Sequence, residues 1–513
     1  MTTPFLELQK ISKVYAGVKA LDNVDFTVQQ KEIHCLVGEN GSGKSTLIKI
    51  ISGVIKPEPS GKIIIEGEEI SHLTSKLSTS KGIHVIYQDL SLFPTLTVAE
   101  NIAFNLHTEG NTKIVNWKTI QDTSEKILAE IGINLNLRSQ VSSLSIADQQ
   151  LVAICRALVG KTRLLILDEP TSSLTKYEVD SLIRIIHDLQ NRGITTLFIS
   201  HKLNEIFEIA DNVTVLRDGK KIGTFKREDL NYEKLTYYMT GKKIEYTKLS
   251  HLTEPQKYIL EIKNLSKKGN FKDINFSLKK GEILGITGLL GSGRTELALA
   301  LFGMNPYETG EIYIDGKKTE ISSNTDSLQN GIAYVPENRL LKGLVMNQSI
   351  QNNILITILN SLLDSYNLLS QSKKDVHSET WIKNLSIKVK SPYDPVMTLS
   401  GGNQQKVLLA KWIATHPKIL ILDEPTSGID VAAKSSIHAL IRKLAEDGMS
   451  IILISSEVHE VLYNCHRILI MRKGHLCGEV YPDEVTEKEL FTFINEGYCP
   501  KNLRKKEPNY VQG

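Results

Sequence analysis

The stretch Gly38-Glu39-Asn40-Gly41-Ser42-Gly43-Lys44-Ser45 matches the phosphate-loop pattern G-x-x-x-x-G-K-[ST] in full. An apolar segment, residues 33–37, runs into it, and residues 46–52 follow as an expected helix with Gly53 at the stop position. Glycines let successive backbone N–H groups turn toward phosphate oxygens, and the helix start adds a favourable dipole. The alternative is a Gly-rich turn between a strand and a helix, which the residues downstream disfavour.

This loop predicts a nucleotide-binding site with defined side-chain roles. Lys44 is expected to reach the β- and γ-phosphates, and the Ser45 hydroxyl is expected to bind Mg²⁺. The predicted nucleotide-binding set of this loop is Gly38, Glu39, Asn40, Gly41, Ser42, Gly43, Lys44, Ser45 and Thr46.

A second motif is the apolar run at residues 164–167, which ends in Asp168 and Glu169. Asp168 is expected to hold Mg²⁺ directly or through water, and Glu169 to orient and deprotonate an attacking water. One of the two carboxylates could instead cap the next helix. That alternative does not account for the pair in a chain that also carries a phosphate loop.

Both motifs recur, which indicates a duplicated domain. The loop returns as Gly288-Leu289-Leu290-Gly291-Ser292-Gly293-Arg294-Thr295, and the segment 167–172 returns at 422–427. A period of about 250 residues with the motif order kept is too long for a solenoid. The polar stretch 241–257 carries turn-formers and mixed charge, so the boundary is expected there. We predict a first domain at 1–243, a linker at 244–257, a second domain at 258–500 and a polar tail at 501–513.

The coarse pattern predicts an α/β fold. Residues 6–9 and 24–28 alternate like strands of a half-exposed sheet, whereas 164–167 and 195–199 resemble buried parallel strands. Hydrophobic content of 41% and charged content of 23% are ordinary for a soluble protein, and a net charge of +3 is too small to favour nucleic-acid binding. The five cysteines form no CxxC pair, which fits a reducing compartment.

Membrane signals are also absent from the sequence pattern. The first residues lack the basic and apolar regions of a signal peptide. The longest apolar runs are strand-sized, far below the roughly 20 residues that cross a bilayer. If the protein works at a membrane, other chains are expected to span it.

A third pair of motifs connects the sequence to a family. The strings Leu144-Ser145-Ile146-Ala147-Asp148 and Leu399-Ser400-Gly401-Gly402-Asn403 lie between the loops and the acidic pairs. With His201 after a buried strand, this order resembles ATP-binding-cassette ATPases, twice over nearly the whole chain. The resemblance implies two P-loop NTPase cassettes, each with a mostly parallel sheet core, an antiparallel β subdomain and a helical signature subdomain. It also implies that each signature serine and its backbone amides face the γ-phosphate of ATP held by the opposing cassette.

The resemblance assigns further residues one by one. Tyr15 matches the aromatic that stacks on adenine, with a core or surface tyrosine as the alternative. Gln88 matches the glutamine that senses Mg²⁺ and water, where an exposed loop amide is the plain alternative. His201 matches the switch histidine at the γ-phosphate, although a lone histidine is often structural. The expected catalytic residues are therefore Glu169, His201 and Gln88, and the expected metal ligands are Ser45, Gln88 and Asp168.

The two halves differ at these positions. Arg294 replaces the loop lysine, Glu337 the glutamine and Ser456 the histidine, whereas Asp423 and Glu424 are retained. Arginine keeps the charge, but its planar fork is bulkier than a lysine ammonium. No aromatic matches Tyr15 in the second half, and Thr175 stands where the loop that links the two sites usually has Asp in this family.

Head-to-tail pairing of the halves turns these differences into a prediction. The complete first loop would meet the intact signature, whose contacts are Ser400, Gly401, Gly402 and Asn403. The second loop, with Gly288, Gly291, Gly293, Arg294 and Thr295 as its binding set, would meet the altered first signature, in which Ala147 and Asp148 crowd and repel a phosphate. Hydrolysis is therefore expected mainly at the first loop.

The motifs GRTEL, PE-x-R and LSGGNQQK narrow the resemblance. They are similar to those in ATPases of bacterial importers for ribose, galactose, arabinose, xylose or autoinducer-2. This implies a permease, expected as a dimer, a periplasmic sugar-binding protein, and a peripheral place on the cytoplasmic face of the inner membrane. A soluble tandem ATPase acting on ribosomes is the alternative, disfavoured by the short linker and the altered second site. A pure nucleotide-binding regulator is disfavoured by Glu169 and His201.

Overall fold

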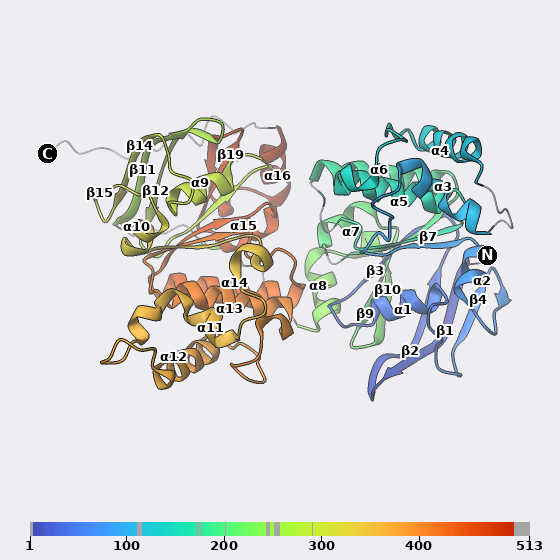
Figure 1. Cartoon of the computed structure of the whole chain (residues 1–513), viewed down its shortest axis with the longest axis horizontal. Coiled ribbons are helices and arrows are strands. Elements are labelled where there is room, and N and C mark those ends of the chain that lie inside the picture. The colour runs from blue at the N-terminus through green and yellow to red at the C-terminus, as the bar shows by residue number, and fades with distance from the viewer. Residues whose placement is uncertain are drawn as a thin grey trace. The chain divides into compact units, whose positions relative to one another are not determined.

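The computed structural model describes residues 4–109, 115–171, 174, 176–200, 202–242, 247–250, 257–289 and 291–496. The chain divides into two compact units, Met1–Ile244 and Glu245–Gly513, which run from blue to green and from yellow to red in Figure 1. The expected linker 244–257 is described only at 247–250 and 257, and the expected tail 501–513 lies outside the described residues.

The first unit contains a four-stranded antiparallel sheet of order β2-β1-β4-β5 and a six-stranded sheet of order β10-β9-β3-β8-β7-β6. The larger sheet is parallel from β9 to β6, and β10 pairs with β9 in the antiparallel sense. The strands are β1 (Leu6–Tyr15), β2 (Val18–Val28), β3 (Ile33–Val37), β4 (Lys62–Ile65), β5 (Glu68–Glu69), β6 (Ile83–Ile86), β7 (Leu164–Asp168), β8 (Thr195–Ile199), β9 (Asn212–Arg217) and β10 (Lys220–Lys226).

The helices of the first unit fall into two groups. Helices α3, α4 and α5 pack on one another as a separate helical part (Figure 1). Helices α1, α2, α6 and α7 connect strands of the two sheets, and α8 follows the last strand. The α-helices are α1 (Lys44–Ile51), α2 (Ser75–Ser80), α3 (Val98–Glu109), α4 (Trp117–Ile131), α5 (Ile146–Leu158), α6 (Lys176–Asn191), α7 (Leu203–Ile209) and α8 (Tyr232–Thr240), with short turns η1 (Val141–Ser143) and η2 (Arg227–Asp229).

The second unit repeats this architecture, with sheets of order β12-β11-β14-β15 and β16-β17-β18-β13-β19-β20. Its strands are β11 (Tyr258–Lys267), β12 (Phe271–Lys279), β13 (Ile283–Thr287), β14 (Thr309–Ile314), β15 (Lys317–Thr319), β16 (Ile332–Val335), β17 (Ile419–Asp423), β18 (Ser450–Ile454), β19 (Arg467–Arg472) and β20 (His475–Val480). Its helices are α9 (Arg294–Leu301), α10 (Asn324–Gln329), η3 (Arg339–Gly343), α11 (Ile350–Leu355), η4 (Ile356–Leu362), α12 (Gln371–Asn384), η5 (Val396–Thr398), α13 (Gly401–Ile413), α14 (Val431–Glu446), α15 (Val458–Asn464), η6 (Pro482–Glu484) and α16 (Glu487–Glu496).

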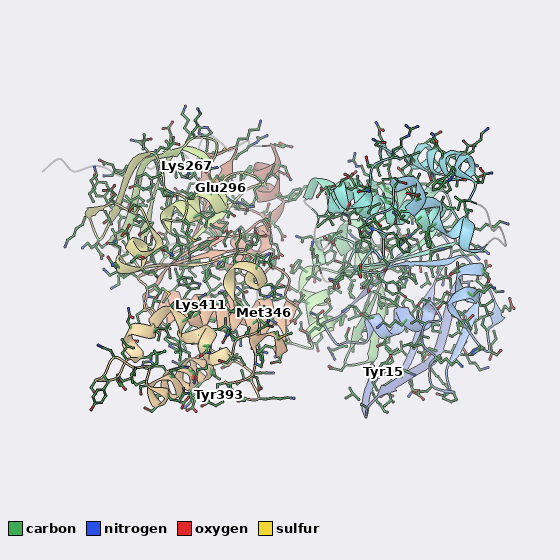
Figure 2. All side chains as sticks on the ribbon, in the orientation of Figure 1. Tyr15, Lys267, Glu296, Met346, Tyr393 and Lys411 are labelled. Carbon is green, nitrogen blue, oxygen red and sulfur yellow. The ribbon has the colours of Figure 1, made fainter. Side chains whose placement is uncertain are left out.

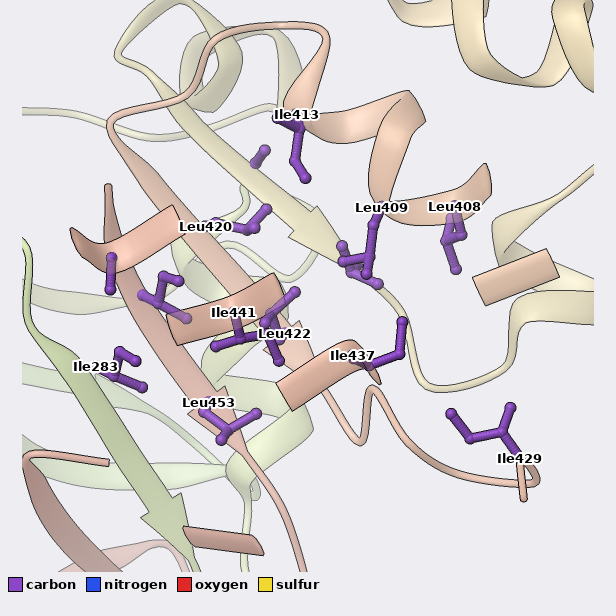
Figure 3. Packing of buried hydrophobic residues seen from close by; sticks show 14 of the residues in the cluster. Ile283, Leu408, Leu409, Ile413, Leu420, Leu422, Ile429, Ile437, Ile441 and Leu453 are labelled. Carbon is purple, nitrogen blue, oxygen red and sulfur yellow. The ribbon is translucent and has the colours of Figure 1, made fainter. Parts of the chain in front are cut away.

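Hydrophobic patterning explains both sheets. In β1 and β2 the apolar residues alternate, and the register pairs buried Leu6 with Val28 and Leu8 with Phe26, which confirms the expected half-exposed sheet. Strands β3 and β8 are buried along their whole length, as parallel strands covered on both faces should be. In the second unit one hydrophobic cluster lies between the large sheet and helices α13 and α14, with Leu409, Leu422 and Ile437 among its members (Figure 3), and another lies between the large sheet, α9 and the smaller sheet.

The helix after the first loop ends where the sequence indicated but begins earlier. Gly53 has φ of 68°, and its N–H donates to the carbonyl of Ile50 at 3.0 Å, while Val54 N–H donates to Lys49 at 2.9 Å. The helix starts at Lys44, two residues before the predicted 46–52, because Leu47 N–H already donates to the carbonyl of Gly43 at 2.9 Å. Lys44 therefore belongs to the first helical turn.

Candidate functional site

The loop from β3 to α1 is a tight backbone cradle. Gly38 has φ of 157° and Gly43 has φ of 103°. A Cβ atom on Gly38 would lie 2.2 Å from the carbonyl oxygen of Leu216, and one on Gly43 would lie 2.5 Å from that of Ala20. The loop thus packs its backbone directly on β9 and β2, and no side chain fits at these two positions.

Polar groups converge on this cradle. The Lys44 side chain is 7% exposed, and its Nζ donates to the carbonyls of Gly38 at 2.7 Å and Glu39 at 3.0 Å. The buried Oγ of Ser42 has no hydrogen-bond partner among the described residues. A positive charge held over a loop of backbone amides at a helix start fits an anionic ligand such as a phosphate.

The acidic pair lies at the end of β7. Asp168 is the last residue of this strand, and Glu169 follows with φ of 49°, its N–H donating to the carbonyl of Ile199 at 3.0 Å. Burial raises the pKa of Asp168, the charge of Glu169 adds to that rise, and the charges of Lys44 and Lys49 oppose it. The structure therefore brings the loop lysine and this carboxylate close enough to interact. A positive φ at a non-glycine residue is a strained conformation of the kind that clusters at functional sites.

The remaining predicted residues of the first unit lie around this centre or outside the described part. Gln88 is exposed two residues after β6, the strand beside β7, and Ser45 is exposed on the first turn of α1. Tyr15, labelled in Figure 2, ends β1 with 44% of its surface exposed, and Lys13 Nζ lies 5.8 Å from its ring centroid. His201 lies outside the described residues, as do positions 172, 173 and 175.

The loop from β13 to α9 repeats the first cradle. Gly288 has φ of 157° and Gly293 has φ of 98°, within a few degrees of their counterparts. A Cβ atom on Gly288 would lie 2.1 Å from the carbonyl oxygen of Met471. Ser292 Oγ is likewise buried without a hydrogen-bond partner in the described part of the chain. The second unit has therefore kept the backbone of the site.

The charged group in the second cradle pairs differently. Arg294 is 7% exposed, and its Nη2 lies 3.8 Å from Oε1 of Glu424, the counterpart of Glu169. The same oxygen accepts a hydrogen bond from the N–H of Ser456 at 2.8 Å. Burial raises the pKa of Glu424 to about 8, and the contact with Arg294 offsets only part of that rise. Arg294 Nη1 is buried with no hydrogen-bond partner among the described residues, so this guanidinium keeps a donor for an anion.

A tyrosine that no sequence motif indicated contacts the other carboxylate. Tyr334 donates from its hydroxyl to Oδ2 of Asp423 at 3.0 Å, and Asp423 is fully buried. Burial raises the pKa of Asp423, Thr295 and Tyr334 lower it, and the nearby charge of Glu337 raises it further. The residue at the place of Tyr334 in β6 is Val85, which carries no polar group. Comparing the two edge strands position by position would have revealed this difference.

The two signature helices start with different hydrogen bonds. In the first unit Ser145 Oγ donates to Oδ2 of Asp148 at 2.9 Å and accepts from its N–H at 3.1 Å, so both functions of the hydroxyl are engaged. In the second unit Ser400 Oγ accepts from Nδ2 of Asn403 at 3.0 Å and forms no cap to the helix backbone. The Ser400 hydroxyl does not donate to a carboxylate as Ser145 does, because Asn403 stands at the place of Asp148.

The glycines of the second signature are constrained by close packing. A Cβ atom on Gly402 would lie 2.6 Å from Cβ of Ala433, and one on Gly401 would lie 3.0 Å from Nη2 of Arg339. Asn403 is also fixed at its other end, because its Oδ1 accepts from the N–H of Lys388 at 2.9 Å. The intact signature is thus a rigid helix start with its backbone pressed against neighbouring groups.

Two nucleotide cradles, two acidic pairs and two signature helices define a tandem pair of ATP-binding cassettes. The family model "ABC transporter" matches residues 21–172 and 271–427. The chain is 43% identical to a xylose import ATP-binding protein of Moorella thermoacetica, covering 96% of this chain and 99% of that protein. It is 38% identical to a ribose import ATP-binding protein of Shouchella clausii, covering 96% and 98%. The chain therefore belongs to the ABC transporter family, as one of its ATPases.

A solved ATP-binding cassette of an ABC transporter in its ADP conformation is also similar, with 25% identity and a TM-score of 0.43, covering 47% of this chain and all of that one. In the described ranges, the helices are too short or too polar for any of them to cross a membrane.

Proposed function

We propose that this chain is the ATP-hydrolysing subunit of a bacterial importer for a monosaccharide or a related small carbohydrate. The full-length relatives are named for the import of xylose and ribose, which supports a sugar as cargo. The observation that carries the proposal is the first cradle, where Lys44 lies over the loop carbonyls and within electrostatic reach of Asp168. The names of these relatives give the ribosome alternative no support.

The first cassette supplies most of the hydrolytic site. The loop amides and Lys44 bind the phosphates of ATP, and Tyr15 stacks on the adenine. Glu169 orients the attacking water and accepts its proton, with Gln88 and His201 at the γ-phosphate. Ser45, Gln88 and Asp168 are suited by their oxygen donors to hold Mg²⁺, which supplies charge neutralisation for the phosphates when bound. The carboxyl of Asp168 at the end of β7 and the exposed Ser45 on the first turn of α1 provide oxygen donors that fit a divalent cation.

The second cassette completes that site and keeps a weaker one of its own. The hydroxyl of Ser400 and the amides of Gly401, Gly402 and Asn403 contact the γ-phosphate held by the first loop, with the two cassettes of one chain paired head to tail. The loop containing Arg294 binds nucleotide but hydrolyses it slowly. Three observations support this: Glu424 and Asp423 already have protein partners, and Asp148 engages Ser145.

The importer needs partners that this chain does not supply. We propose a membrane permease, present as a dimer, and a periplasmic sugar-binding protein, with this chain bound peripherally at the cytoplasmic face of the inner membrane. The segments that follow Gln88 and Glu337 dock the permease. The import functions in the names of the relatives support this assembly.

Sugar-stimulated ATP hydrolysis tests the proposal. The full chain is purified with the membrane protein that co-purifies with it, reconstituted in vesicles, and assayed with xylose or ribose and the binding protein. We expect the sugar to stimulate phosphate release and Lys44→Ala to abolish it, with Lys226→Ala, an exposed lysine on β10, as the control. Co-purification with ribosomes, or phosphate release that no sugar stimulates, would contradict the importer.

A further inference from the structure

Arg339 joins three parts of the second cassette through its guanidinium. Its Nη1 donates to the carbonyl of Ser427 at 2.8 Å, its Nη2 to that of Gly428 at 3.1 Å, and its Nε to Oε1 of Gln404 at 3.4 Å. Ser427 and Gly428 belong to the loop after the acidic pair, and Gln404 lies in the first turn of the signature helix α13. One side chain thus connects the segment after Glu337 with the signature and with this loop.

The geometry around Gly401 places the guanidinium against the start of the signature helix. A Cβ atom on Gly401 would meet Nη2 of Arg339 at 3.0 Å and the carbonyl oxygen of Gly428 at 3.5 Å. Gln404 is held in the orientation that this contact needs, because its Nε2 donates to the carbonyl of Leu399 at 3.0 Å and leaves Oε1 facing Arg339. The guanidinium therefore lies beside Gly401 and contacts the side chain of Gln404 at the start of the signature helix.

The turn that carries Arg339 is itself fixed at both ends. Arg339 opens η3, a single π-helical turn, and such turns occur frequently at functional sites. The Asn338 side chain accepts from the N–H of Leu341 at 2.9 Å, and Nζ of Lys411, labelled in Figure 2, donates to the carbonyl of Gly343 at 3.0 Å. Hydrogen bonds at both ends thus hold the turn that carries Arg339 in place.

The first cassette joins the equivalent segments through a cation on its signature helix. There Arg156, on the signature helix α5, donates to the carbonyls of Leu90 and Ser91 at 2.9 and 2.8 Å, in the loop after Gln88. Lys411 takes the place of Arg156 on α13. The second cassette keeps this connection, since Lys411 donates to the carbonyl of Gly343, and adds a second one from Arg339, which comes from the loop and is directed at the intact signature.

We propose that Arg339 is a positioning residue for ATP hydrolysis, which fixes the signature amides and the loop of Ser427 and Gly428 relative to the segment after Glu337. This rests on the proposed function, in which the second signature completes the site at the first phosphate loop. The guanidinium of Arg339 is directed at Gln404, Ser427 and Gly428, so its proposed effect on hydrolysis is exerted through the signature amides. Donors to a developing charge are effective only when held in place, and a misplacement near 1 Å can cost about 100-fold in rate.

The test measures kcat and KM for ATP on the full chain carrying Arg339→Ala, Arg339→Lys or Arg442→Ala. We expect Arg339→Ala to lower kcat about 10- to 100-fold. The KM for ATP should change less than about 3-fold, because ATP binds first to the first phosphate loop, which Arg339 does not belong to. Arg339→Lys should recover part of kcat, since an ammonium can satisfy one of the two carbonyls. Arg442 is the matched control: it also donates to a backbone carbonyl, that of Tyr463 at 2.9 Å, but from α14 to the end of α15.

A double-mutant cycle with Gly401→Ala separates positioning from general stability. The added methyl displaces the same guanidinium, so the two changes should be less than additive in kcat. Full additivity, or a kcat for Arg339→Ala equal to that of Arg442→Ala at equal thermal stability, would overturn the role. If Lys44→Ala leaves ATP turnover intact, the proposed function of this chain as an ATPase fails. If Lys44→Ala abolishes turnover and Arg339→Ala does not lower it, only the role of Arg339 fails.

Discussion

The two phosphate loops of this chain have nearly the same backbone but different side-chain partners. Gly38 and Gly288 both have φ of 157°. Each lies close to a backbone carbonyl in the large sheet of its own unit, Gly38 to that of Leu216 and Gly288 to that of Met471. Yet Lys44 folds onto its own loop, whereas Arg294 reaches across to Glu424. The comparison shows that a nucleotide cradle can persist through backbone packing while its chemistry changes through a few side chains.

The different shapes of the lysine and arginine side chains explain much of the difference between the two loops. A lysine ammonium is a compact charge that two loop carbonyls can satisfy, whereas a guanidinium carries donors in a wide planar fork. In the second cradle Nη2 of Arg294 lies beside Glu424, and Nη1 has no hydrogen-bond partner among the described residues. Bound nucleotide could therefore use Nη1 of Arg294, whereas Nη2 would be shared with Glu424. The same carboxylate position in the first cassette belongs to Glu169, the expected base.

The largest predicted difference between the cassettes concerns these two carboxylates. Glu169→Gln removes the group that accepts the proton of water, so ATP turnover should fall about 100-fold or more. Glu424→Gln should change turnover less than about 3-fold, because its carboxylate is already engaged by Arg294 and Ser456. Steady-state phosphate release from the full chain measures both. Equal losses in the two variants would show that the cassettes are equivalent catalysts.

The next largest effect should come from transferring a signature defect between the cassettes. Asn403→Asp introduces at the second signature the carboxylate that engages Ser145 in the first. The new carboxylate should accept the Ser400 hydroxyl and repel the γ-phosphate, which lowers kcat about 10-fold. The reciprocal variant Asp148→Asn should leave turnover at the first loop unchanged. A rise in turnover for Asp148→Asn would mean that the first signature serves the active loop, because the variant removes the carboxylate that occupies Ser145.

The sequence was sufficient for the architecture, whereas the roles it assigns to the residues of the first site stay predictions. The loop pattern, the acidic strand and the repeat predicted two α/β domains because each motif demands a strand-loop-helix context, and the family match confirms this. The altered residues Arg294 and Ser456 were also visible. Their partners were not, because a side chain's reach across strands depends on three-dimensional packing. Tyr334 with Asp423, and Arg339 with Ser427, are separated by about 90 residues in the sequence.

The smallest effect in this comparison is the pH dependence of the second unit. Burial raises the pKa of Glu424 from 4.5 in a free side chain to about 8. Between these values the folded state binds more protons than the unfolded state, so the free energy of unfolding decreases as pH rises. The contribution of protonated Glu424 to the free energy of unfolding is complete below about pH 4.5. It decreases as pH rises and stops decreasing above about pH 8. Between pH 6 and 7 the slope should be about 1 kcal/mol per pH unit.

Glu424→Gln isolates this term, because glutamine resembles the protonated carboxyl in shape and does not titrate. Denaturant unfolding of wild type and variant at pH 6 and pH 7 should show wild type losing about 1 kcal/mol more than the variant over that step. Arg294→Ala should extend the loss to higher pH, since Arg294 favours the ionised form of Glu424 and its removal raises the pKa further. Parallel pH profiles for wild type and Glu424→Gln would mean that Glu424 stays ionised in the fold. The pair with Arg294 would then be a stronger contact than its 3.8 Å separation indicates.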